Sequence, residues 1–278
     1  MSKISEKLDI INNSKNDIKT AIENKGVVVG NVGIQDYAKK IDAMEVKTPV
    51  EKGLVINKID ADGFVTDASI VGMTAIPDYY LYYAILRSGS NENKRTWLSK
   101  IGENLHLPND LTSIGSDAFY GCNQLLGLIL PDTLIFIGEG AFQSCSRFTL
   151  KSLPSGIENI GENCFRACSE LDIKILPSGI TLIPNSCFYA CSKLIELTCE
   201  GDIKSINGNA FYNSKLEKLV LPNVTSVPTL ANISAFTNTP IRNGSGYVYF
   251  PDSLVEEAKE KTNWSTIASQ IKGVSELW

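Results

Sequence analysis

Residues 107–129 of the chain read LPNDLTSIGSDAFYGCNQLLGLI, and the next 23 residues, from Leu130, read LPDTLIFIGEGAFQSCSRFTLKS. The pattern begins again at Leu153, at Leu176 and at Cys199, where the unit is one residue shorter. A phenylalanine therefore recurs every 23 residues, as Phe119, Phe142, Phe165, Phe188 and Phe211. Self-similarity at a fixed period of this length predicts a solenoid in which each unit stacks on the next.

The repeated positions have physical roles in such a stack. Strands of neighbouring units pair about 4.7–4.9 Å apart, a spacing at which phenylalanine rings stack with an offset. Two aliphatic columns accompany the rings: Leu111, Leu134, Ile157, Ile180 and Ile203, then Ile114, Ile137, Ile160, Ile183 and Ile206. Gly115, Gly138 and Gly161 follow the second column and indicate a tight bend or a positive φ.

The spacing of the seven cysteines follows the 23-residue repeat and is not typical of a disulfide framework. Four of them are 23 residues apart, at Cys122, Cys145, Cys168 and Cys191. As zinc ligands, the CxxxC pairs would need partners at tetrahedral-site spacing, which the repeat does not supply. We interpret the thiols as reduced, buried small hydrophobes and expect neither a metal nor a cofactor.

The unit L-P-x-x-[LI]-x-x-I-G-x-x-[AC]-F-x-x-C-x-x-L resembles BspA-type (Treponema pallidum type) leucine-rich repeats over about residues 107–222. The resemblance implies an α/β repeat fold, a curved leucine-rich-repeat solenoid with a strand-lined face backed by short helical or turn segments. It also implies a role in adhesion or binding. In two units, FTLKSLP and LDIKILP place their apolar residues one position off LLGLILP, so the outward strand positions are ambiguous there.

The first 46 residues predict a helical attachment or oligomerisation segment, with one helix over 3–24 and a second over about 34–44. Its apolar seam has a 3-4 spacing interrupted by Lys15 and consists of Ile4, Leu8, Ile11, Ile18 and Ile22. Isoleucine and leucine at the two seam positions favour a homotrimeric coiled coil, and packing of the helix on its own chain is the alternative.

The pattern K-x-x-I-x-x-A-I-x-x-K-G-V-x-V-G, followed by D-Y-A-x-K-I, spans residues 15–41. It is similar to N-terminal segments of phage tail and baseplate proteins. This resemblance implies attachment to other virion proteins through the N-terminal segment.

The remaining regions flank the repeats over 107–222. Residues 47–106 predict a β-rich linker, with a hairpin around Asp62-Gly63, and a degenerate capping repeat that includes Met73, Ile76 and Leu81. Residues 223–278 predict a C-terminal strand and helical cap: an irregular stretch, the last strand YVYF, a helix to about Lys261 and another over 264–271. The cap would cover the last unit of the stack.

Several function classes find no support in the composition. The net charge of −5 argues against nucleic-acid binding, and no run of 18 apolar residues indicates membrane insertion. His106 is the single histidine, without a nucleophile signature around it, and phosphate-binding glycine motifs are absent. The acidic residues are spread among variable positions, which does not favour a glycosidase pair. We therefore expect a protein that is not an enzyme.

The leading functional hypothesis is a phage tail or baseplate structural protein that displays the repeats for binding a host-surface glycan or protein. The N-terminus carries no signal-peptide pattern, so we expect synthesis in the host cytoplasm and a place in the virion. The alternatives are a BspA-like adhesin of the bacterial cell surface and a polysaccharide-processing enzyme built on a solenoid.

Binding is expected at the variable outward positions, because the ladder positions are fixed by packing. Aromatic and arginine side chains are common interface anchors. The candidate surface consists of Tyr120, Lys151, Arg166, Lys174, Tyr189, Glu196 and Tyr212. The alternative is that these are ordinary solvated side chains.

Overall fold

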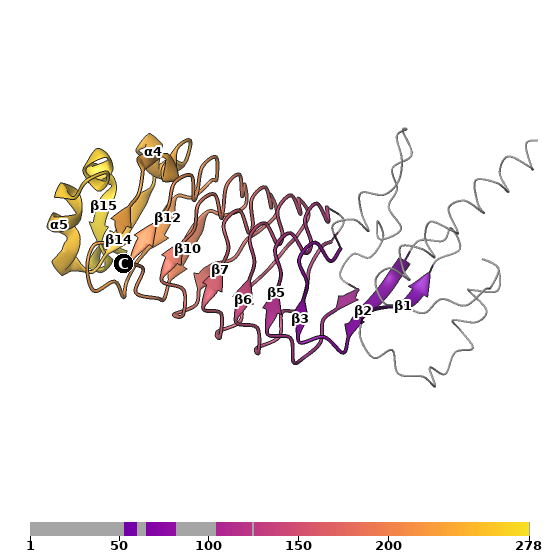
Figure 1. The fold of residues 1–278 in the computed structure, drawn as a ribbon. Coiled ribbons are helices and arrows are strands. Elements are labelled where there is room, and N and C mark those ends of the chain that lie inside the picture. The colour runs from indigo at the N-terminus through magenta and orange to yellow at the C-terminus, as the bar shows by residue number, and fades with distance from the viewer. Residues whose placement is uncertain (1–52, 60–64, 82–103, 124, 278) are drawn as a thin grey trace, which may run out of the picture.

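The computed structural model describes residues 53–59, 65–81, 104–123 and 125–277, and these form a solenoid of successive coils (Figure 1). The helical segment expected over 1–46, with its seam of Ile4, Leu8, Ile11, Ile18 and Ile22, lies outside the described residues. The homotrimer and the virion contacts assigned to it therefore stay predictions.

Each coil contributes a short parallel strand to a first wall of the solenoid, and from β8 onwards the coils also contribute a strand to a second wall. The first wall contains a four-stranded sheet, β3 (Ala75–Ile76), β5 (Ser113–Ile114), β6 (Phe136–Ile137) and β7 (Asn159–Ile160), and a three-stranded sheet, β9 (Leu182–Ile183), β11 (Ser205–Ile206) and β13 (Thr229–Leu230). The second wall contains a five-stranded sheet, β8 (Ile175–Leu176), β10 (Glu196–Cys199), β12 (Lys218–Val220), β14 (Tyr247–Phe250) and β15 (Ile271–Gly273). The described part of the repeats consists of strands and turns, so the segments behind the strands are turns and not helices.

A proline divides the first wall into its two sheets. At one position of each coil a backbone N–H donates to the coil before it: Gly161 to Ile137 O at 2.8 Å, and Asn207 to Ile183 O at 2.9 Å. Pro184 occupies the same position in the intervening unit and has no N–H to donate. The ladder of hydrogen bonds is therefore interrupted between β7 and β9.

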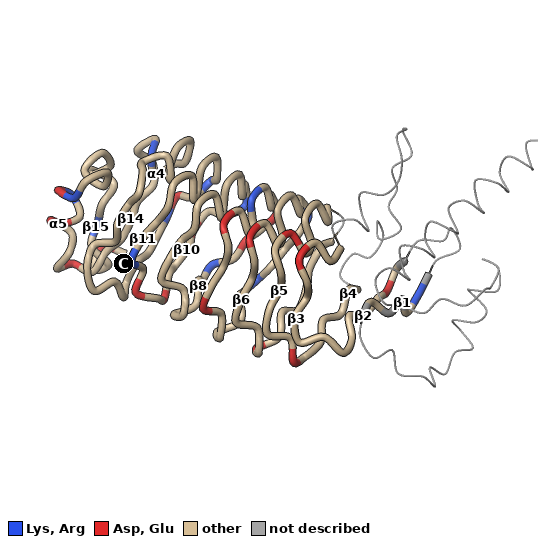
Figure 2. Tube along the Cα trace, viewed as in Figure 1, with Lys and Arg blue, Asp and Glu red and all other residues tan. Residues whose placement is uncertain are grey.

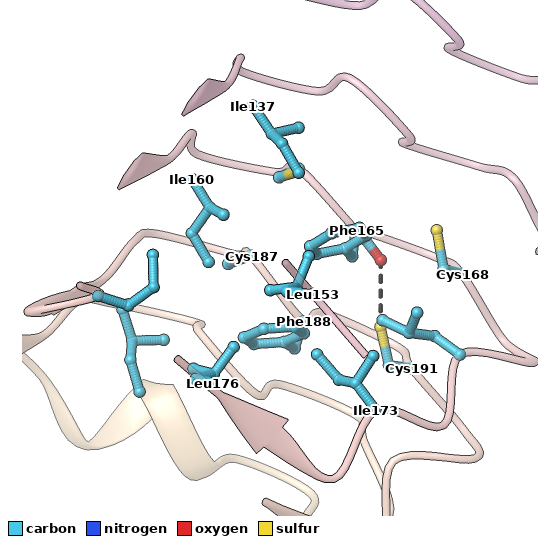
Figure 3. Close-up of a cluster of buried hydrophobic side chains, with 14 of the residues drawn as sticks. Ile137, Leu153, Ile160, Phe165, Cys168, Ile173, Leu176, Cys187, Phe188 and Cys191 are labelled. Atoms are coloured by element: carbon cyan, nitrogen blue, oxygen red, sulfur yellow. Dashed lines mark hydrogen bonds between the residues drawn. The ribbon is translucent and has the colours of Figure 1, made fainter. Parts of the chain in front are cut away.

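The predicted phenylalanine ladder is confirmed and forms the centre of the core (Figure 3). The Phe119 and Phe142 rings stack with centroids 5.1 Å apart, and the following pairs lie 5.6–5.8 Å apart with interplanar angles up to 11°. All five rings are fully buried, and every residue of the two aliphatic columns beside them is buried. Burial of each ring is worth roughly 1.5–3 kcal/mol, and each ring depends on the neighbouring coil for it.

The cysteines are confirmed as buried packing residues without disulfide bonds. Some of the thiols also donate to backbone carbonyls of an earlier coil. Cys168 Sγ donates to Phe142 O at 3.0 Å. Cys191 Sγ donates to Phe165 O at 3.1 Å (Figure 3). Burial raises the pKa of both thiols well above the ordinary value. The thiols therefore stay protonated and serve as donors.

The glycines after the second aliphatic column serve close packing and not a positive φ. A Cβ on Gly138 would lie 2.6 Å from the carbonyl carbon of Gly115, so only glycine allows the coils to approach this closely. The left-handed residues occupy two other columns: Asp117, Gly140, Asn163, Ser186 and Asn209, then Gly121, Ser144, Ala167, Ala190 and Asn213. Each coil therefore turns twice through a conformation that costs side-chain-bearing residues about 1–2 kcal/mol.

A hairpin and an irregular coil precede the first regular coil of the array. Strands β1 (Gly53–Ile59) and β2 (Val65–Val71) form an antiparallel hairpin, and β4 (Leu105–His106) pairs with β2. Strand β3 pairs with β5, and Leu81 N donates to Ala118 O at 2.7 Å. Because Leu81 is buried where later coils place phenylalanine, this segment is a degenerate repeat that covers the start of the ladder.

The C-terminal region differs from the prediction in two places. The stretch expected to be irregular contains β13, a 3-10 helix η1 (Ile233–Phe236) and α4 (Pro240–Asn243). Phe236 stacks 5.7 Å from Phe211 and continues the ladder; the sequence period conceals it because the two lie 25 residues apart. The strand β14 is not the last one, since β15 forms from residues expected at a helix end and pairs with β14.

Short helices lie in the region where the sequence predicts a helical cap. They are η2 (Asp252–Leu254), α5 (Val255–Glu260), η3 (Trp264–Gln270) and η4 (Val274–Leu277). Ala258 is fully buried, and the Trp264 ring lies 5.9 Å from Phe236 at a 49° tilt. Trp264 Nε1 also donates to Pro228 O at 2.8 Å, so the indole ends the ring stack with its polar group satisfied.

The ladder predicts a strong position dependence of phenylalanine replacement. Phe165→Ala should lower the free energy of unfolding by about 3–5 kcal/mol, because it removes a ring stacked on both sides and leaves a cavity. Phe136→Ala is the matched control, since Phe136 is 42% exposed on the first wall and should cost less than about 1 kcal/mol. Urea unfolding measures both, and equal losses would contradict the ladder as the central core element.

The left-handed columns predict opposite signs for two alanine-to-glycine changes. Ala190→Gly should raise the free energy of unfolding by about 0.5 kcal/mol, because glycine relieves the left-handed strain at φ 57° but adds chain entropy to the unfolded state. Ala231→Gly, at an exposed residue outside the left-handed columns, should lower it by about 0.5–1 kcal/mol. Destabilisation of similar size at both positions would count against the two-turn geometry.

Candidate binding surface

The candidate residues fall into two rows on the outside of the coils. The turn row contains the residue after each ladder phenylalanine: Tyr120, Gln143, Arg166, Tyr189 and Tyr212. The sheet row lies on the outward side of the five-stranded sheet: Lys174, Glu196, Lys218, Tyr247, Tyr249 and Lys272. Lys151 is exposed one unit before Lys174. Figure 2 shows charged residues spread along the coils instead of gathered into one basic face.

The turn row contains a continuous stack over three units. The Arg166 guanidinium carbon lies 4.0 Å from the centroid of the Tyr189 ring, and the Tyr189 and Tyr212 rings lie 4.9 Å apart with a 2° interplanar angle. All three side chains are partly exposed. Since the rings face each other, the stack presents ring edges, phenol hydroxyls and one guanidinium to the solvent.

The sheet row resolves the ambiguous strand positions of the sequence. In the unit LDIKILP, Ile173 and Leu176 are buried whereas Lys174 points outward. Lys174 Nζ lies 2.7 Å from Asp172 Oδ1 and 3.7 Å from Glu196 Oε1, and the hydrogen bond that Lys174 donates to Asp172 contributes most to raising the pKa of Lys174. These pairs are exposed, so their contribution to stability is small.

Sequence reasoning missed the C-terminal part of the sheet row. Tyr247 and Tyr249 alternate with buried Val248 and Phe250, and this alternation in YVYF could have indicated outward rings. No local signal indicates that Lys272 lies beside them, because this depends on the pairing of β15 with β14.

One polar cluster on the N-terminal hairpin has the residue types of a catalytic triad but not its connections. His106 Nε2 lies 3.5 Å from Asp67 Oδ1, and Ser69 is the strand partner of His106. Asn57 Nδ2 donates to both Asp67 and Ser69. No hydrogen bond joins Ser69 to His106 in the described part of the chain, so His106 is not placed to activate the hydroxyl.

A second polar group links consecutive coils near the C-terminal end. Asp202 accepts hydrogen bonds from Lys204 Nζ and from both the backbone N and Oγ1 of Thr225. These bonds, that of Lys204 first, lower the pKa of Asp202 from 3.8 to about 2. The carboxylate therefore joins its own coil to the next one and serves a structural role.

Comparison with known families identifies the repeat. The family described as "BspA type Leucine rich repeat region" matches residues 112–242 in six copies. Over these residues the chain is similar to a BspA-type leucine-rich repeat array. The array accounts for the coils described above, and its C-terminal limit includes Phe236, which the 23-residue period had not reached. The match does not reach residues 15–41, so the resemblance to phage tail proteins gains no support from it.

Three solved structures are similar to this chain. A leucine-rich cell surface protein from Faecalibacterium prausnitzii is 22% identical, with a TM-score of 0.47 over 73% of this chain and 54% of that one. A leucine-rich repeat protein from T. pallidum is 19% identical, with a TM-score of 0.38 over 63% and 86% of the two chains. One from Bacteroides ovatus is 19% identical, with a TM-score of 0.40 over 75% and 60%.

The match thus spans about half the length of the F. prausnitzii protein. No curated protein matches the chain. Within the described ranges, no helix has the length and apolar character needed to cross a bilayer, and no three His, Cys, Asp or Glu side chains are grouped as metal ligands would be.

The Asp202 contacts predict a defined loss of stability in acid. Because the folded-state pKa is lowered, the carboxylate stabilises the fold above about pH 4, and this contribution is lost as the pH falls towards 2. Asp202→Asn should therefore melt at a lower temperature than the parent at pH 6 and show a smaller difference at pH 2. Asp132→Asn, at an exposed aspartate of another unit, should keep the parent profile. Parallel pH profiles for Asp202→Asn and the parent would refute the assignment.

Proposed function

We propose that the chain is a non-enzymatic binding protein that acts as a BspA-like adhesin of a bacterial cell surface. The observation that carries this proposal is the difference between buried and outward positions of the repeat. The residue types at buried positions are nearly the same in every coil, whereas those at outward positions differ from coil to coil. The family match over residues 112–242 supports it, because adhesion or binding is the role that BspA-type resemblance implies.

The turn row supports a binding role through its rigidity. Arg166, Tyr189 and Tyr212 are held in one arrangement by their mutual contacts. Side chains that are already ordered lose less conformational entropy when a partner binds, and arginine and tyrosine are frequent interface anchors. Such a surface suits recognition of a large partner better than turnover of a substrate.

A virion tail or baseplate protein is the second candidate. The specific observation in its favour is the sequence pattern over residues 15–41, which is similar to N-terminal segments of phage tail and baseplate proteins. In that setting the same repeats would bind a host-surface glycan or protein, and the N-terminal segment would bind other virion proteins.

Mass spectrometry separates the two candidates. Under the first proposal, peptides of this chain are released by brief protease treatment of intact bacteria. Their detection in purified virions, with none released from the cell surface, would reject the adhesin and favour the tail protein.

The turn row predicts a binding defect without a folding defect for Arg166→Ala. Binding of labelled protein to cell surfaces, measured by flow cytometry and on a glycan array, should fall about tenfold, as expected for loss of an interface anchor worth about 1.4 kcal/mol. Arg147→Ala, at an exposed arginine outside the row, is the matched control and should bind normally. Tyr189→Ala should also lower the melting temperature, because it breaks the stack on both sides. Unchanged binding of Arg166→Ala would reject the turn row as a contact surface.

A further inference from the structure

Four side chains form a compact patch at the C-terminal end of the sheet row, here called the Tyr–Lys patch. They are Lys218 on β12, Tyr247 and Tyr249 on the neighbouring strand β14, and Lys272 on β15. Lys218 is in register with Tyr247, and Lys272 is in register with Tyr249. The two lysines therefore lie on either side of the two tyrosines.

The lysines reach across the patch diagonally, each to the ring that is not its register partner. Lys272 Nζ lies 4.2 Å from the centroid of the Tyr247 ring, and Lys218 Nζ lies 6.0 Å from that of Tyr249. The two rings are 6.3 Å apart and tilted by 58°. Ammonium groups over aromatic faces are attracted by the ring quadrupole, so both charges are held close to the sheet instead of extending into solvent.

The patch offers positive charge in a chain whose net charge is −5. Within the described residues, Lys218 makes no ion pair, and the carboxylate of its register partner Glu196 is engaged by Lys174 at 3.7 Å. Lys272 shares its charge with Glu276 at 3.6 Å, across an exposed contact that a stronger anion can displace. The phenol hydroxyls add hydrogen-bond donors beside the ammonium groups.

The backbone of the two central strands of the patch is not available to a partner. Strands β12 and β14 are paired on both sides, so their N–H and C=O groups are used within the sheet. A peptide cannot add as a further strand beside β12 or β14, so recognition over these two strands runs through side chains. Lys218 and Lys272 stand on strands two positions apart, about 9.5 Å, so a chain with several negative charges can contact both at once.

We propose that the Tyr–Lys patch binds an acidic polysaccharide, one that carries carboxylate or sulfate groups along an extended chain. This inference rests on the proposed adhesin function and names the class of molecule that its surface recognises. The lysines supply charge-assisted hydrogen bonds to the acidic groups, and the tyrosines position the lysines and donate to sugar oxygens.

Binding of the full chain to hyaluronan, heparin and neutral dextran, measured by biolayer interferometry at two salt concentrations, tests this directly. We expect binding to at least one acidic polysaccharide, weakened by salt, and none to dextran. The double change Lys218→Gln with Lys272→Gln should lower the affinity at least tenfold. Lys193→Gln with Lys215→Gln changes the net charge equally at exposed lysines outside the patch and should have little effect. Lys272→Arg should retain most of the binding, because the cation remains.

Three outcomes would overturn the proposal: equal loss in both double variants, dextran binding as strong as that of the acidic chains, or tighter binding of poly-glutamate than of every acidic polysaccharide, which would indicate an acidic peptide partner. Melting temperatures of both double variants verify that the fold is intact. If the parent chain binds no acidic polysaccharide and cell binding persists in the Lys218→Gln, Lys272→Gln variant, the patch is rejected and the adhesin proposal stands. Polysaccharide binding by a chain that is absent from the cell surface would reject the adhesin alone.

Discussion

The stacking of one phenylalanine per coil is the constraint on which the rest of the structure depends. Each ring is buried only because the coils before and after it lie at the distance that a ring stack requires. This fixes the phase of every coil, so side chains at the same outward position also come into line. The stack of Arg166, Tyr189 and Tyr212 on the outside is therefore a consequence of the stack inside.

A stack of this kind has two ends, and the chain closes each with different chemistry. Leu81, on a degenerate coil, covers the first ring, and the tilted indole of Trp264 covers Phe236. The C-terminal closure also adds β14 and β15 to the five-stranded sheet, which brings Tyr247 and Lys272 to its outward face. The cap thus has two roles: it protects the core and it builds the Tyr–Lys patch.

The outward positions are free to vary because the core does not use them. This freedom explains why the turn row and the sheet row carry different side chains from coil to coil, while the aliphatic columns hardly change. It also explains why function cannot be derived from the repeat alone. A regular array supports many partners, and the choice among them depends on which side chains occupy a few neighbouring outward positions.

The sequence by itself determined the ladder, the aliphatic columns, the buried cysteines, the degenerate coil around Ile76 and the covering role of the C-terminal helices. These follow from periodicity and burial, which are local properties of the repeat. Tertiary structure alone decided that Phe236 continues the ladder, that Gly138 allows close approach of coils, that Pro184 splits one wall and that Lys272 reaches Tyr247. The physical reason is that each of these features depends on which atoms of another coil lie nearby. The spacing of residue types along the chain does not identify those neighbouring atoms.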